Sequence, residues 1–122
     1  MTDLGESLAH AIATKDADAL RGLLHPEVEF RAVTPSRFWE ADSADEVIDE
    51  VILGRWFSPA DRIDAVERVE HDTVADRERV GYRFRVRRED REFLVEQQAY
   101  FHAHEGRIDW LRVMCAGYQP VD

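Results

Sequence analysis

The spacing of apolar residues predicts helices in the first half of the chain and strands in the second. Leu4, Leu8 and Ile12 recur every four residues, as on the buried stripe of a helix of about three turns. Asp16 is suited to cap a second, short helix, which we expect Pro26 to end. The N-terminal part of the chain is therefore predicted to be a pair of helices.

A first strand is predicted at residues 27–34, followed by a third helix. Ser43 and Glu46 have the spacing of a capping box, which predicts a helix from about Ala44 to Trp56. The residues expected to face inward on this helix are Val47, Ile48, Val51 and Ile52.

After Pro59 the apolar period changes from 3.6 to 2, which indicates strands. The predicted strands lie near 62–73, 79–88, 92–104 and 107–118. Helices followed by a meander of antiparallel strands are typical of an α+β fold. We expect residues 1–122 to form one such domain.

The hairpin around Glu89-Asp90 can be aligned from the sequence. A two-residue turn there sets Val80, Tyr82, Phe84 and Val86 opposite Ala99, Gln97, Val95 and Phe93. The same register pairs Arg83 with Glu96 and Arg87 with Glu92 on the other face. One face of the hairpin is therefore apolar and the other carries complementary charges.

The last hairpin is predicted to turn through three residues, His104 to Gly106. This register places Leu111, Val113 and Cys115 opposite Ala99, Gln97 and Val95. A two-residue turn is rejected because it would place Arg112 on the apolar face. The outer face then carries Leu94, Tyr100, Trp110 and Met114, an apolar patch that we expect a second copy of the chain to cover in a homodimer.

Composition excludes several classes of function. The formal net charge is −10, from 26 acidic and 16 basic residues, so nucleic acid is not an expected partner. The first twenty residues contain no long apolar run, which predicts neither a signal peptide nor a membrane span, and hence a cytoplasmic location. The single cysteine, Cys115, excludes an internal disulfide.

His102 and His104, followed by Glu105, have a spacing that could hold a metal ion on one face of a strand. However, that face is predicted to be rich in arginine, and no third histidine lies within the hairpin. We therefore expect these histidines to be solvated at the strand end, and we expect neither a metal site nor a cofactor.

Three segments of the chain resemble the NTF2-like superfamily, in particular SnoaL-like proteins. They are AIATKDADALRGLLHPEVEF (11–30), FWEADSADEVIDEV (38–51) and VEQQAYFHAHEGRIDWLRVMCAGYQP (95–120), which together span nearly the whole chain. The resemblance implies a cone-shaped α+β barrel, a curved sheet around helices that encloses an apolar pocket, often in a homodimer formed through the outer face of the sheet. It does not imply one function, because the superfamily includes both enzymes and binding domains.

One member, ketosteroid isomerase, uses a carboxylate base, a tyrosine and a protonated aspartic acid. Alignment by eye places these three polar groups at Phe30, Leu8 and Ala99, all of which are apolar. Steroid isomerase chemistry of that kind is therefore not expected.

The pocket implied by the fold would be lined mainly by apolar and aromatic side chains. The expected lining is Phe30, Trp39, Trp56, Tyr82, Phe84, Phe93, Val95, Gln97, Phe101, Leu111, Val113 and Cys115. Gln97 is the unusual member, since a buried amide without a partner is costly. It either bonds Tyr82 across the hairpin or contacts a ligand.

Few residues are candidates for catalysis. Asp109 is predicted on the inward face, where burial would raise its pKa, and His25 could serve as a general acid or base. Each also has a structural interpretation, as a residue beside a turn and as a residue at a helix C-terminus. In the segment 34–40, predicted to be the mouth of the pocket, Arg37 could bind an acidic group and Trp39 could stack on a ring.

Three functions remain open from the sequence. The first is a protein that binds a small hydrophobic or aromatic molecule. The second is a cofactor-free isomerase, cyclase or hydrolase that uses Asp109 or His25 with Gln97 and Tyr82. The third is an interaction module whose barrel is filled by Trp39, Trp56 and Phe101.

Overall fold

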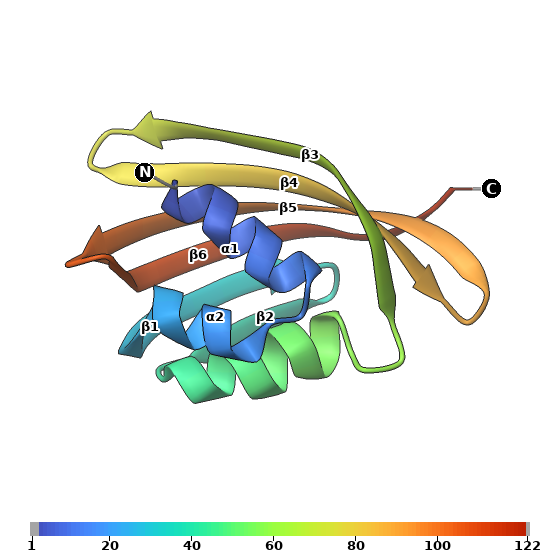
Figure 1. Ribbon diagram of the computed structural model, residues 1–122, viewed down its shortest axis with the longest axis horizontal. Helices are drawn as coiled ribbons and strands as arrows, with labels where there is room; N and C mark the ends of the chain where they lie inside the picture. Colours follow the sequence, from blue (N-terminus) through green and yellow to red (C-terminus); the bar gives the residue numbers. More distant parts are fainter. Residues whose placement is uncertain (1–2, 122) are drawn as a thin grey trace.

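A computed structural model describes residues 3–121 as a curved six-stranded sheet with three helices on its concave side (Figure 1). The helices are α1 (Leu4–Ala13), α2 (Ala17–Leu23) and η1 (Glu46–Trp56). The strands are β1 (Leu24–Thr34), β2 (Arg37–Ala41), β3 (Arg62–Val74), β4 (Arg77–Arg88), β5 (Arg91–His104) and β6 (Arg107–Pro120). The predicted α+β class is confirmed.

The strands are arranged in the order β2-β1-β6-β5-β4-β3. Only β1 and β6 pair in parallel among these neighbours. The edge strands β2 and β3 do not pair with each other, so the sheet is open and curls around the helices without closing. The segment predicted to be the mouth of the pocket contains β2, an edge strand that the sequence analysis did not predict.

The three helices begin where side-chain oxygens accept backbone N–H groups. The Asp3 carboxylate accepts from the N–H of Glu6 at 3.1 Å, and the Asp16 carboxylate accepts from that of Ala19 at 3.0 Å. The Ser43 hydroxyl accepts from the N–H of Glu46 at 3.2 Å. The caps predicted at Asp16 and Ser43 are therefore confirmed.

The third helix has a wider turn than expected. It is a π-helix, in which each N–H reaches the carbonyl five residues back, as the N–H of Phe57 does to Ile52 at 2.9 Å. Its apolar face is the predicted one and is buried: Val47, Ile48, Val51 and Ile52.

The β4–β5 hairpin has the predicted register. Tyr82 pairs with Gln97, and Arg83 pairs with Glu96. Glu89 and Asp90 form the two-residue turn with φ angles of 51° and 63°. Such a turn matches the twist of the flanking strands.

The β5–β6 hairpin differs from the predicted one. Its turn consists of two residues, Glu105 and Gly106, both with positive φ. Asp109 is an extra residue in β6, because Ile108 pairs with Ala103 and Trp110 pairs with His102. This β-bulge keeps Arg112 off the apolar face, which was the reason for rejecting a two-residue turn.

The bulge therefore shifts the register between β5 and β6 but leaves Leu111, Val113 and Cys115 on their predicted face of the sheet. Cys115 lies opposite Gln97, two residues from the predicted position, and Val113 lies opposite Ala99. Among residues 3–121, no helix is long and apolar enough to span a membrane.

Candidate functional site

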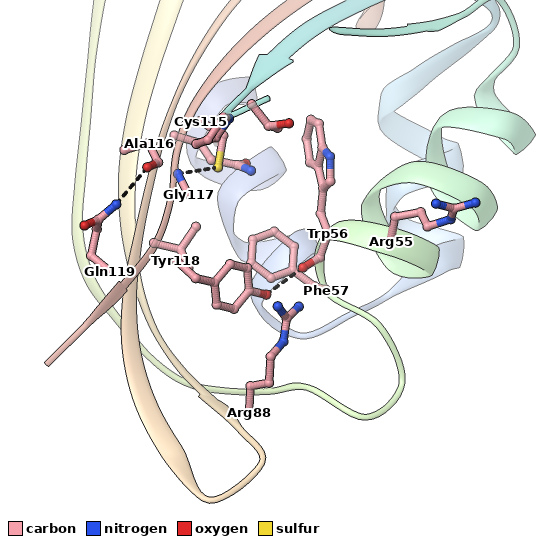
Figure 2. A pocket seen from close by; sticks show the side chains of 13 residues that line it. Arg55, Trp56, Phe57, Arg88, Cys115, Ala116, Gly117, Tyr118 and Gln119 are labelled. Carbon is pink, nitrogen blue, oxygen red and sulfur yellow. Dashed lines mark hydrogen bonds between the residues drawn. The ribbon is translucent and has the colours of Figure 1, made fainter. Parts of the chain in front are cut away.

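A cavity of about 410 Å³ lies between the C-terminal end of η1 and the inner face of β5 and β6 (Figure 2). Its lining includes Trp56, Phe57, Val95, Gln97, Cys115 and Tyr118. A volume of this size is typical of sites for small molecules.

A second bulge in β6 shapes the wall of the cavity. Val95 pairs with Tyr118 and Gln97 pairs with Cys115, so β6 has one more residue than β5 between these pairs. Gly117, in this bulge, has a φ of 87°, and a Cβ atom there would lie 2.9 Å from Cγ of Pro35. Only glycine fits this conformation and this close contact without strain.

Tyr118 connects β6 to the end of η1. Its hydroxyl donates a hydrogen bond to the backbone carbonyl of Trp56 at 2.6 Å, and its ring lies beside Phe57 (Figure 2). Burial raises the pKa of Tyr118, although the positive charge of Arg88 opposes the shift. The hydroxyl is therefore a neutral donor at physiological pH.

A charged cluster around Asp61 supports the edge of the cavity. Asp61 is only 4% exposed, and its carboxylate accepts two hydrogen bonds from Arg88, at 2.7 and 2.8 Å. It also accepts from the N–H and hydroxyl of Ser58, while Lys15 donates to the backbone carbonyls of Ser58 and Asp61. Arg88 also stacks on the ring of Tyr118, with its guanidinium carbon 3.9 Å from the ring centre. The arginine charge is thus compensated by a buried carboxylate.

Gln97 lines the cavity and carries a buried, unpaired donor. Its side-chain oxygen accepts a hydrogen bond from the Tyr82 hydroxyl at 2.6 Å. Its Nε2 is buried and makes no hydrogen bond within the part of the chain that the structure describes. The predicted hydrogen bond between Gln97 and Tyr82 is therefore present, and it uses only the amide oxygen. The amide nitrogen stays available for the predicted contact with a ligand.

Trp56 Nε1 is the other buried side-chain donor without a partner in residues 3–121. Figure 2 places this nitrogen on the side of the indole ring away from Tyr118. The ring packs edge-to-face on Trp39, with centroids 6.0 Å apart, and tilts against Phe30. Trp56 therefore serves the cavity as an apolar wall.

Four residues of the expected lining, Trp56, Val95, Gln97 and Cys115, line this cavity. Tyr82 lies behind Gln97 and is buried. Five other apolar residues of that prediction belong to the core and are almost completely buried: Phe30, Phe84, Phe101, Leu111 and Val113. Phe93 is half-buried and lies beside the Tyr118 ring.

Arg37 and Trp39 lie beside a separate, smaller pocket of about 200 Å³ between β2 and η1. The guanidinium of Arg37 stacks on the Trp39 ring at 3.7 Å, and Trp39 Nε1 donates to the hydroxyl of Thr34 at 2.8 Å. Both side chains therefore lie at this smaller pocket and not at the main cavity, and their contact with a ligand stays a prediction.

The two predicted catalytic residues do not line the cavity. Asp109 was predicted on the inward face, as a possible base or as a solvated residue beside the turn, but the bulge places its carboxylate 2.8 Å from Nδ1 of His102. The hydrogen bond from His102 lowers the pKa of Asp109. His25 lies in β1, not at a helix C-terminus, and its Nδ1 accepts the N–H of Glu27 at 3.0 Å.

Three residues at or beside the cavity were not predicted from the sequence: Arg88, Asp61 and Tyr118. Arg88 had a usable signal, because it continues the alternation of Val80, Tyr82, Phe84 and Val86 on the inner face. Tyr118 had none, since the bulge at Gly117 changes its pairing without changing the composition of the strand.

No family model matches the sequence, and no curated protein matches it. Solved structures do share its fold. A protein from Pseudomonas putida, provisionally named a polyketide cyclase, superposes with a TM-score of 0.70 at 13% identity, over 92% of this chain and 88% of that one. A provisionally named SnoaL-like polyketide cyclase from Mesorhizobium loti gives 0.67 at 11% identity, over 93% and 98%.

An LEH-like epoxide hydrolase from Mycobacterium tuberculosis also matches, with a TM-score of 0.67 at 12% identity, over 92% of this chain and 79% of that one. These similarities define the class of fold: the chain has the cone-shaped NTF2-like fold that SnoaL-like proteins share. The predicted resemblance is thereby confirmed for the fold.

Proposed function

We propose that the protein binds a small hydrophobic or aromatic molecule in the cavity beside η1. The observation that carries this proposal is the open volume of about 410 Å³ with aromatic walls at Trp56, Phe57 and Tyr118. A barrel filled by its own side chains would leave no such volume, although Trp39 and Trp56 do pack together. Solved structures with the same fold carry the names of polyketide cyclases and an epoxide hydrolase, which supports a site for a small molecule in this fold.

Native mass spectrometry of the purified protein tests the proposal directly. We expect a fraction of the protein to carry a co-purified small molecule that is released on denaturation. Protein that is free of ligand and that also fails to bind any member of a library of aromatic fragments would contradict the proposal.

Cys115→Phe is expected to weaken this binding. The Cys115 side chain lines the cavity, so a phenyl ring there would occupy space that the ligand needs. We expect fragment affinity, measured by calorimetry, to fall at least about tenfold, the effect of losing a well-filled pocket site. Met114→Phe, on the neighbouring exposed residue of β6, is the matched control and should leave affinity unchanged.

We also propose that the outer face of the sheet binds a second copy of the chain. Val33, Phe38 and Met114 are 51%, 56% and 62% exposed and surround a groove of about 380 Å³. Of the predicted interface residues, Met114 is exposed, whereas Leu94, Tyr100 and Trp110 are half-buried. The paired Arg112 and Glu29 beside the groove give this face charges of both signs, which a symmetric copy can complement.

Met114→Glu is expected to convert a dimer to a monomer, because it places a charge at the centre of the apolar contact. Sedimentation velocity at micromolar concentration measures the change. Val74→Glu, at an exposed valine on β3, is the control that should leave the dimer intact. A monomeric unmodified protein would contradict this second proposal.

A further inference from the structure

Gln97 lines the cavity, and the nitrogen of its buried amide has no hydrogen-bond partner in residues 3–121. We propose that the molecule in the cavity is a carbonyl compound, an apolar or aromatic ketone, ester or quinone whose oxygen accepts a hydrogen bond from Nε2 of Gln97. This inference rests on the proposed function, since it assigns a chemical class to the occupant of the same cavity.

The unpaired donor of Gln97 has a cost in free energy. Gln97 is 2% exposed, and an amide N–H group that is buried without an acceptor loses its hydration with no compensation. Most buried polar groups in folded proteins have a partner, and exceptions call for an explanation such as a ligand. An acceptor on the bound molecule removes this cost.

The Gln97 amide has a fixed orientation. The Tyr82 hydroxyl donates to the Gln97 oxygen at 2.6 Å, which leaves the nitrogen as the free end. Burial raises the pKa of Tyr82, so the hydroxyl keeps its proton and remains a donor. Tyr82 is in turn held by stacking on Phe84, with ring centroids 4.8 Å apart. The site therefore offers a donor and selects a ligand that brings an acceptor.

The cationic side chains of the cavity lining are compensated or directed away from the Gln97 side of the cavity. The cavity lining contains two arginines and no acidic residue. Arg88 is compensated by Asp61, and Figure 2 shows the guanidinium of Arg55 directed away from Tyr118 and Cys115. An anionic group has no free cation beside it deep in the cavity, whereas a neutral carbonyl needs only the amide.

The position of Cys115 provides a reporter for occupancy. It is the only cysteine of the chain, it lines the cavity, and it pairs with Gln97 across β5 and β6. A molecule held at Gln97 is expected to shield this thiol from iodoacetamide. Intact mass spectrometry then gives the fraction of labelled protein, because the chain has no second thiol that could react.

The experiment compares 2-acetylnaphthalene with 2-ethylnaphthalene, which have nearly the same shape and differ in the carbonyl. Each is titrated against Cys115 alkylation and, independently, by calorimetry, in the unmodified protein and in Gln97→Met. We expect the preference for the ketone to be about threefold to tenfold greater in the unmodified protein than in Gln97→Met, the effect of one neutral hydrogen bond. Because the ratio is taken within each protein, a general loss of stability in the variant cancels.

Tyr82→Phe is the second variant, and it keeps Gln97 in place while removing the group that orients it. We expect an intermediate ketone preference with unchanged affinity for 2-ethylnaphthalene. An equal preference in all three proteins would overturn the inference and leave the proposed function standing. Failure of both probes to bind or to shield Cys115 would overturn the proposed function, and the inference with it.

Discussion

Replacing Asp61 by alanine is expected to lower the free energy of unfolding by about 2–3 kcal/mol, because it removes hydrogen bonds to a buried carboxylate whose partner, Arg88, is itself 37% exposed. The carboxylate is almost fully buried and accepts hydrogen bonds from Arg88 and Ser58. Without it, the Ser58 N–H loses its acceptor and the guanidinium of Arg88 loses its counter-charge beside the ring of Tyr118. Urea denaturation followed by circular dichroism measures the change.

Asp45→Ala is the matched control. Asp45 forms an ion pair with Arg21 at 3.0 Å, but its side chain is 78% exposed. Ion pairs at such a surface contribute about 0–1 kcal/mol. Equal losses in the two variants would mean that the Asp61 cluster is no more important for stability than a surface ion pair.

The stabilising effect of Asp61 should disappear in acid. Burial favours the protonated form, but the hydrogen bonds from Arg88 and Ser58 outweigh it and lower the pKa of Asp61 in the folded state. A carboxyl group whose pKa is lowered by folding stabilises the protein above its unfolded-state pKa of about 3.9, and this contribution is lost as the pH falls through the folded-state value. The stability difference between the unmodified protein and Asp61→Ala should therefore be constant near neutral pH and decrease below about pH 4.

The regular part of the fold could be predicted because two independent patterns agreed. In the β4–β5 hairpin, the inward alternation that includes Tyr82 and Gln97 requires the same register as the pairing of Arg83 with Glu96. A slip by one residue would break both patterns at once. Local sequence therefore determines this hairpin, and with it the position of the amide in the candidate site.

The irregular part could not be predicted because bulges leave no trace in the alternation. Asp109 and Gly117 each lie in a bulge that displaces the pairing of β6. The first turns a predicted inward carboxylate toward His102, and the second determines how Tyr118 pairs with β5 at the cavity. The bulge at Gly117 thus shapes the wall of the site and the bulge at Asp109 keeps that carboxylate out of it, while the apolar face on which the site is built depends on the regular period.

The wide turn of η1 is the third irregularity, and Gly54→Ala is expected to destabilise the protein by about 2–3 kcal/mol, as overpacking does. A Cβ atom at position 54 would lie well inside the van der Waals distance of the Asp49 carbonyl oxygen, the carbonyl five residues back. Relief requires the helix to shift, which would move Trp56 and Phe57 at the cavity wall. Both thermal unfolding and fragment binding should therefore be impaired.

Gly22→Ala is the matched control, since it makes the same substitution in α2. A Cβ atom at position 22 meets no heavy atom within 4 Å, so only helix propensity acts, and alanine should raise stability by about 0.5–1 kcal/mol. The two variants are thus expected to shift the melting temperature in opposite directions. If Gly54→Ala were also stabilising, the backbone of η1 would have to be an ordinary α-helix in solution. Because an α-turn contains fewer residues than a π-turn, the side chains at the C-terminal end of η1 would then be rotated away from the cavity.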